Sequence, residues 1–224
     1  MIKKLFILLV MLSASILVNA QDVKESPYRA ERTKVNDLVH TKLKVDFNFA
    51  KSQMNGEAWL TLKPHFYPTN SVTLDAKAML IEKVSDANNT ALNYTYKDNK
   101  LKVDLGNIYS RNENFTIYIK YIARPEEVKQ KGSAAITDAK GLYFIDPTET
   151  DPDKPTQIWT QGETEANSVW FPTLDTPNQK STEEIYITVP NKFVTLSNGL
   201  LTSQTDNTDG TRTDYWKMDL PHAP

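Results

Sequence analysis

The sequence predicts an all-β domain whose antiparallel sheets form a sandwich-like or saddle-like arrangement. Apolar and polar residues alternate in many short segments, and this is the period of a half-buried strand. Prolines and turns rich in Asn and Asp separate these segments, and no long segment repeats apolar residues at helical spacing. The chain has 224 residues, of which 39% are hydrophobic, and this is enough to bury the core of one large domain.

The first half of the chain carries the clearest alternation of apolar and polar residues. Asp98-Asn99 is a turn signal that joins two alternating segments into a hairpin, and Asn55-Gly56 predicts an earlier turn. Residues 126–130 are long enough only for a single helical turn. Strands are expected over residues 43–49, 58–62, 72–74, 80–84, 92–96, 101–105 and 115–121.

The second half of the chain has fewer strand signals and one long irregular stretch. Residues 133–151 lack a clean period and predict a long loop around a short strand at 142–144. Loops of this length often carry function. Further strands are expected over residues 185–189, 193–201 and 215–220, with a polar loop over 205–213 between the last two.

Residues 1–20 have the composition of a secretory signal peptide. Two lysines precede an apolar run at 5–18, which is shorter than the roughly 20 residues of a membrane-spanning helix. Gln21, rather than Cys, follows the expected cleavage site, so no lipid anchor is indicated. The mature protein is expected to be periplasmic or secreted, with no membrane span once the signal is removed. A polar lead-in at 21–36 and one domain at 37–224 are expected to follow.

The composition excludes several classes of protein and site. With 26 Lys and Arg against 28 Asp and Glu, the chain lacks the basic excess of a nucleic-acid-binding protein. It contains no Cys, so disulfides, thiolate zinc sites and cysteine nucleophiles are ruled out. The three histidines, His40, His65 and His222, lie too far apart in sequence for a local metal-binding pair, and no metal ligand is assigned among them.

One segment, residues 157–190, combines polar and aromatic motifs in a distinctive order. It contains Gln161-Gly162-Glu163, then Phe171-Pro172, then Asp175-Thr176-Pro177, then Lys180, and it ends in an apolar strand. Each motif alone is more often an ordinary turn or corner. In this order and spacing, the motifs resemble the N-terminal domain of zinc aminopeptidases of the aminopeptidase N family, the gluzincin peptidases that include the leukotriene hydrolases.

The resemblance extends over roughly residues 37–224 and departs from the family pattern at three positions. Thr173 stands where the family often has Cys, Thr176 where Glu is commonest, and Asn167 near a frequent Arg. These are packing and turn positions more than ligand positions. The departures therefore bear on the subfamily rather than on the family.

The resemblance implies that Glu163 binds the α-ammonium group of a peptide substrate and that Gln161 orients the same end through its amide. A carboxylate suits this task because it accepts charge-assisted hydrogen bonds from an ammonium group. Packing is the expected role of Tyr143 and Trp159, with lining of the pocket as the alternative. Three further carboxylates are expected to face solvent: Glu165, Glu183 and Glu184.

The zinc-binding motif of that family, His-Glu-x-x-His with a downstream Glu, is absent from the chain, as is its Gly-x-Met-Glu-Asn motif. In the family both follow this domain. The chain is therefore expected to be the N-terminal, substrate-recognising piece of an exported zinc aminopeptidase, truncated before the catalytic domain. No catalytic residue, metal ligand or cofactor is assigned to this piece. Its expected partners are peptide N-termini and the missing catalytic domain, which would hold the zinc.

A secreted, non-catalytic β-sandwich module that binds peptides or sugars is the alternative. Exposed aromatic side chains on a sandwich can hold such ligands, and the tryptophans are the candidates. A coding region that continues past Pro224 into a His-Glu-x-x-His segment would exclude this alternative, whereas a stop codon there would favour it. The four candidates are Trp59, Trp159, Trp170 and Trp216.

Overall fold

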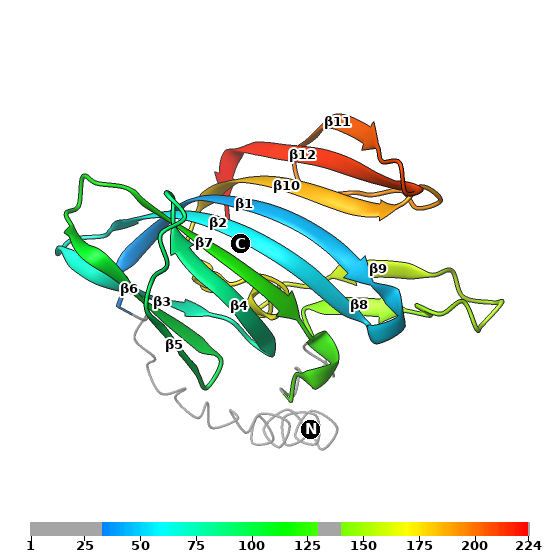
Figure 1. The fold of residues 1–224 in the computed structure, drawn as a ribbon, viewed down its shortest axis with the longest axis horizontal. Coiled ribbons are helices and arrows are strands. Elements are labelled where there is room, and N and C mark those ends of the chain that lie inside the picture. The colour runs from blue at the N-terminus through cyan, green and yellow to red at the C-terminus, as the bar shows by residue number, and fades with distance from the viewer. Residues whose placement is uncertain (1–32, 130–139, 224) are drawn as a thin grey trace, which may run out of the picture. The chain divides into compact units, whose positions relative to one another are not determined.

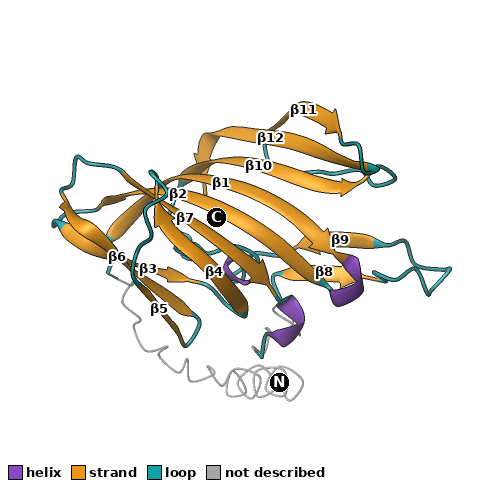
Figure 2. Ribbon diagram, in the orientation of Figure 1, coloured by secondary structure: helices purple, strands orange, loops and turns teal. Residues whose placement is uncertain are grey.

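The computed structural model describes residues 33–129 and 140–223 (Figure 2). The expected signal peptide at 1–20 and most of the lead-in at 21–36 lie outside these residues. Within the described residues, no helix has the length and hydrophobicity needed to cross a bilayer. The described elements are β1 (Asn36–Asn48), η1 (Phe49–Lys51), β2 (Gln53–Pro64), β3 (Thr69–Asp75), β4 (Met79–Asp86), β5 (Tyr94–Lys97), β6 (Lys100–Tyr109), β7 (Phe115–Ala123), η2 (Pro125–Glu127), β8 (Leu142–Ile145), β9 (Gln157–Thr160), η3 (Asn167–Val169), β10 (Ser181–Pro190), β11 (Leu200–Asp206) and β12 (Thr211–His222).

The strands form one large sheet and two small ones, which confirms the predicted all-β class. The large sheet has seven strands in the order β11-β12-β10-β1-β2-β7-β4, and Figure 1 shows them side by side in that order. A three-stranded sheet, β3-β6-β5, and the two-stranded pair β8-β9 complete the described fold. The β1-β10 pair is parallel, whereas the other described pairs are antiparallel. The alternation of residues predicts strands but not this parallel pairing, which joins segments about 140 residues apart.

One face of the seven-stranded sheet, here called the inner face, shares a hydrophobic core with the three-stranded sheet. Leu60 on β2 and Ile119 on β7 are fully buried and belong to the same cluster as Val72 on β3 and Leu101 on β6. Each such side chain contributes about 1.5–3 kcal/mol when it is fully buried. The alternation seen in the sequence therefore marks the residues that join the two sheets.

The turn predicted at Asn55-Gly56 is wrong, because both residues lie within β2. Gly56 pairs with Tyr121 across the β2-β7 ladder, and a Cβ atom on Gly56 would lie 2.2 Å from the Tyr121 ring. The glycine therefore makes room for a fully buried aromatic ring. The chain turns earlier, at η1, where Asn48 accepts a hydrogen bond from the main-chain N–H of Lys51.

The hairpin predicted around Asp98-Asn99 is confirmed. The two residues join β5 to β6 and have φ angles of 51° and 60°. A two-residue turn with positive φ at both positions matches the twist of antiparallel strands, and Asn and Asp adopt such angles more readily than other non-glycine residues.

The strand predicted over residues 193–201 is wrong, since β11 covers Leu200–Asp206. The chain before β11 is held by side chains instead of a ladder. Thr195 donates its hydroxyl to Asp214 Oδ2 at 2.6 Å, and Arg212 Nη2 donates to a main-chain carbonyl of the same segment at 2.9 Å. Arg212 also donates to Asp214 through Nε at 2.7 Å. These contacts depend on β12, so the local sequence does not reveal them.

The polar loop predicted over residues 205–213 is also wrong in extent. Strand β11 runs to Asp206 and β12 starts at Thr211, which leaves a tight turn at 207–210. All residues of β11 are exposed, so this edge strand has no buried face and shows no apolar alternation. Without this alternation, the sequence pattern does not distinguish the edge strand from a loop.

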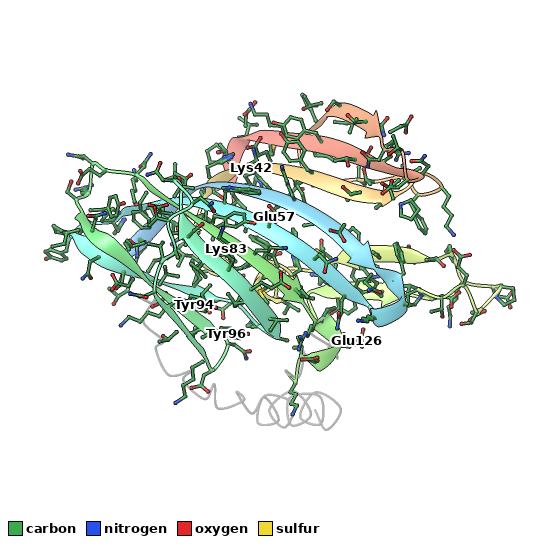
Figure 3. All side chains as sticks on the ribbon, viewed as in Figure 1. Lys42, Glu57, Lys83, Tyr94, Tyr96 and Glu126 are labelled. Carbon is green, nitrogen blue, oxygen red and sulfur yellow. The ribbon has the colours of Figure 1, made fainter. Side chains whose placement is uncertain are left out.

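The outer face of the seven-stranded sheet carries a row of aromatic and charged side chains. The rings of Tyr186 and Tyr215 stack at 4.3 Å, and Lys42 Nζ lies 5.3 Å from Tyr186 and 5.6 Å from Trp59. Figure 3 labels Lys42 and Glu57, which both extend from this face. The ring faces are turned toward neighbouring side chains, so the row stabilises the sheet through cross-strand contacts.

Candidate functional site

The segment with the predicted site residues leaves the β8-β9 pair at the end of β9. The main-chain N–H of Gln161 donates to the Gly141 carbonyl at 2.9 Å, which ties the start of the segment to the residue before β8. Gly141 has φ 69°, and a Cβ atom there would lie 2.0 Å from the Ala166 carbonyl oxygen. Only glycine fits this position, because both the backbone angle and the close approach exclude a side chain.

The predicted Glu163 lies in a turn between Gly162 and Ala166. The N–H of Ala166 donates to the Gly162 carbonyl at 2.8 Å and closes the turn, which leads directly into η3. Ala166, Val169 and Phe171 are buried, and Phe171 belongs to the hydrophobic core on the inner face. The turn is therefore fixed at its base, while the Glu163 side chain is exposed.

Asp175 holds the far end of the segment. The buried Asp175 carboxylate accepts a hydrogen bond from the N–H of Ser168 at 2.9 Å, and a β-bridge between Asp75 and Thr173 ties the chain to β3. Burial raises the pKa of the Asp175 carboxyl, although the Ser168 hydrogen bonds and Lys77 act in the opposite direction. Asp175 thus organises the loop, which is a packing role of the kind expected for a turn motif.

Glu163 lines a hollow of about 690 Å³ on this side of the domain. Three carboxylates contribute to its wall, and no lysine, arginine or histidine is among the described residues that line it. We call it the acidic hollow. Its lining consists of Thr160, Gly162, Glu163, Thr164, Asn167, Trp170, Phe171, Asp175, Thr176, Pro177, Glu183, Leu196, Ser197, Asn198 and Ala223.

The two predicted substrate-binding residues differ in their placement. Glu163 lies in the wall of the acidic hollow, whereas Gln161 is not among the described residues that line it. Gln161 is partly buried and bound to Gly141 through its main chain. The structure therefore brings Glu163, but not Gln161, together with the other carboxylates.

The expectation that Glu183 and Glu184 face solvent is wrong, because their side chains are only 16% and 17% exposed. Glu183 points to the inner face and lines the acidic hollow, where burial raises its pKa although His222 lies 3.3 Å away and opposes this. Glu184 points to the outer face. Burial acts to raise its pKa too, but the hydrogen bond from Tyr215 and the nearby Lys42 outweigh that effect and lower it.

Sequence reasoning could have found Glu183. It occupies the same alternating phase as Ile185 and Ile187, which pack inward, so the period of the strand already places it on the inner face. Its charge alone suggested solvent exposure. The alternation of the strand was the better guide.

A second, mostly apolar hollow of about 250 Å³ adjoins the acidic hollow, since Thr160, Trp170, Leu196 and Ser197 line both. Trp159 contributes to its wall and remains 43% exposed. The Trp159 ring stacks on Tyr143 at 4.3 Å with an interplanar angle of 10°. Tyr143 thus packs against Trp159, as expected, while Trp159 packs and lines a hollow at once.

The described residues contain no group of three or more His, Asp or Glu side chains arranged to bind a metal ion. The three histidines lie in separate pairs. His40 contacts Thr182 and Glu184, His65 contacts Asp37, and His222 contacts Glu183. These residues do not fit a catalytic zinc ion, which takes three protein ligands around one open position.

The sequence profile of the Peptidase M1 N-terminal domain matches residues 37–223 of this chain. The chain belongs to this family. The resemblance that rested on Gln161-Gly162-Glu163 and the motifs after it is therefore confirmed at the level of the family. As an M1 N-terminal domain, the chain also shares 24% identity over 188 residues with leucine aminopeptidase 2 of Vanderwaltozyma polyspora.

Solved structures agree with the fold of this M1 N-terminal domain. The M1 zinc metallopeptidase from Deinococcus radiodurans superposes with a TM-score of 0.70 at 19% identity, over 83% of this chain and 39% of that one. Legionella pneumophila aminopeptidase A in complex with aspartic acid superposes with a TM-score of 0.64 at 18% identity, over 88% of this chain and 21% of that one. The chain spans 26% of the length of the leucine aminopeptidase, so it corresponds to only one part of such proteins.

Proposed function

We propose that this domain is the N-terminal, substrate-recognising part of an exported zinc aminopeptidase that removes N-terminal residues from peptides. Membership of the M1 N-terminal domain family and the likeness to M1 zinc metallopeptidases support the class of enzyme. The apolar run at 5–18 behind two lysines supports export to the periplasm or beyond. We assign zinc and the hydrolytic step to a catalytic domain outside this chain, since the chain spans only 26% of the leucine aminopeptidase and 39% of the zinc metallopeptidase that it resembles.

The observation that carries the proposal is the acidic hollow with Glu163 in its wall. Glu183 is paired with His222 outside the lining, but the described lining itself contributes no lysine or arginine, so an incoming ammonium group would meet an excess of negative charge. Glu163 is exposed at the surface of a turn whose base is buried, which holds the carboxylate in place while leaving it accessible. We assign Glu163 to the α-ammonium group of the substrate, with Gln161 orienting the same end.

The test is Glu163→Ala in the full-length protein that carries this domain, measured as kcat/KM on an L-aminoacyl p-nitroanilide. We expect the bound substrate and the catalytic domain to bury the Glu163–ammonium pair. Removing one partner of a buried charge pair costs about 2–5 kcal/mol, so a loss of roughly 30-fold or more is expected. A further carboxylate from the catalytic domain would retain part of the binding, which places the effect near the lower end. Glu163→Gln should lose less, since its amide oxygen still accepts a hydrogen bond.

Glu165→Ala is the matched control, because Glu165 lies two residues away and is not among the described residues that line the acidic hollow. Its kcat/KM should stay near that of the wild type. N-acetylated substrates should respond little to any of these changes, since they lack the ammonium group. Equal losses at Glu163 and Glu165, or no loss at Glu163, would show that the ammonium site lies elsewhere.

A further inference from the structure

Asn167 makes an unusual set of contacts at the base of the Glu163 turn. It is the first residue of η3, and its side chain lines the acidic hollow beside Glu163. Its Oδ1 accepts a hydrogen bond from Trp170 Nε1 at 3.2 Å. Its main-chain carbonyl accepts from the N–H of Trp170 at 3.0 Å and of Phe171 at 3.2 Å. One residue therefore connects the wall of the hollow to the buried end of the segment.

The chemistry of the indole fixes the orientation of the Asn167 amide. The Trp170 indole N–H can only donate, so the oxygen of the Asn167 amide must face it and the NH₂ group must face away. The amide plane consequently has a defined position, which a freely rotating surface asparagine would lack.

The same amide lies directly against Gly162, the residue that precedes Glu163. A Cβ atom on Gly162 would lie 2.3 Å from Asn167 Nδ2 and 2.4 Å from Oδ1. A side chain at position 162 would therefore force the Asn167 amide to move. Because Gly162 has no side chain, the Asn167 amide packs directly against its backbone. This contact fixes the point where the chain enters the turn.

We propose that Asn167 is a positioning residue that holds the Gly162–Glu163 step so that the Glu163 carboxylate faces the acidic hollow. The inference rests on the proposed function, because it concerns the carboxylate assigned to the substrate ammonium group. Asn167 acts through Glu163 and takes no part in the reaction itself. Its role differs from ordinary packing in one respect: its removal changes the binding of the free N-terminus more than the amount of folded protein.

The first experiment compares Asn167→Ala and Gly162→Ala in the full-length protein, with kinetics on an L-aminoacyl p-nitroanilide. Each single change should lower kcat/KM about five- to twentyfold, since each loosens the contact at the base of the turn. The double variant should be no worse than Asn167→Ala alone, because the new methyl group then occupies the space that the amide has left. If the losses of the two single variants multiply in the double variant, the proposed contact between Gly162 and Asn167 is wrong.

The decisive experiment repeats Asn167→Ala in the Glu163→Ala background. If Asn167 acts through Glu163, its removal should cost no further activity there. The loss in the wild-type background should appear as a raised KM with kcat nearly unchanged, as expected for weakened ground-state binding. A lower apparent kcat at unchanged KM would instead indicate a smaller folded fraction and would overturn the proposal.

Asn167→Asp is the conservative variant, since its carboxylate can still accept the Trp170 hydrogen bond in the same shape. It should retain most of the activity, whereas Asn167→Leu, which keeps the bulk without the acceptor, should not. If Asn167→Ala still lowers activity in the Glu163→Ala background, the positioning role is wrong and the proposed function remains intact. No loss at Glu163 itself would overturn both.

Discussion

Asp214 and Asp175 are both buried carboxylates, yet their surroundings shift their pKa values in opposite directions. Asp214 accepts hydrogen bonds from Arg212, Thr195 and Gln204, and the Arg212 guanidinium holds its pKa below the usual range. Asp175 accepts a hydrogen bond from the Ser168 N–H, and burial raises its pKa. The first carboxylate lies within a matched network, whereas the second lies at the acidic hollow.

The difference between the two regions separates charged groups that stabilise the fold from charged groups that line the acidic hollow. The Arg212–Asp214 network connects β12 to the segment before β11, so its charges are matched internally and serve the fold. The acidic hollow gathers carboxylates without a lysine or arginine in its described lining. Buried charges normally have partners. Glu183 has His222 as its partner, but the excess of carboxylates in the described lining of the hollow supports the proposal that a cationic group binds there.

The largest effect on stability is expected when the matched network is broken. Asp214→Ala removes the acceptor from Arg212, Thr195 and Gln204 together, and this should cost about 2–3 kcal/mol of unfolding free energy. For a domain of this size, such a loss corresponds to a decrease in Tm of roughly 5–10 °C, measurable by calorimetry or thermal circular dichroism at pH 7.

The pH dependence of this network has a defined sign. The pKa of Asp214 is lowered in the folded state, so its contribution is present above the unfolded value near 3.8 and is lost as the pH falls through the folded value. The stability difference between wild type and Asp214→Ala should therefore shrink in acid. An unchanged difference between pH 7 and pH 3 would mean that Asp214 is not charged in the network.

A smaller effect is expected for Gln161→Ala, which tests how far the binding site extends beyond the acidic hollow. A neutral hydrogen bond contributes roughly 0.5–1.5 kcal/mol, so kcat/KM of the full-length protein should fall by about two- to tenfold. Because Gln161 lies outside the described lining of the hollow, a loss as large as that of Glu163→Ala would contradict the smaller role assigned to Gln161.

The sequence was a good guide wherever one strand and its own period decided the structure. The hairpin at Asp98-Asn99 and the inward phase of Leu60 and Ile119 follow from local chemistry alone. Gly56 looked like a turn because its true neighbour, Tyr121, is distant in sequence. The parallel pairing of β1 with β10 was likewise out of reach, since no local pattern encodes it.

The candidate site was predictable only in part. The motif Gln161-Gly162-Glu163 could be located because its order relative to later motifs resembles a family, and the family is confirmed. The meeting of Glu163 with Asp175 and Glu183 at one hollow depends on how η3 and β10 pack, which no spacing reveals. Asn167 read as a departure from the family pattern, and its contact with Gly162 became visible only in three dimensions.

The smallest effect is expected for Asp175→Asn, and its sign separates the two kinds of carboxylate most clearly. Burial raises the pKa of Asp175 above 3.8, so the folded state favours the protonated carboxyl. The contribution of this carboxyl to the free energy of unfolding is therefore present at low pH. It is lost as the pH rises through the pKa of the folded state. At pH 7 the charged carboxylate is a burden on the fold, which a neutral amide removes while its oxygen still accepts from the Ser168 N–H.

Asp175→Asn should therefore raise Tm slightly at pH 7 and leave it unchanged near pH 3, where the wild-type carboxyl is protonated as well. Asp214→Asn is the matched control with the opposite sign, because it removes a charge that Arg212 balances, and it should lower Tm at pH 7. Thermal unfolding of the three proteins at both pH values decides the matter. If both asparagine variants lower Tm at pH 7, the Asp175 carboxylate is as well matched as Asp214, and the contrast between the two regions does not hold.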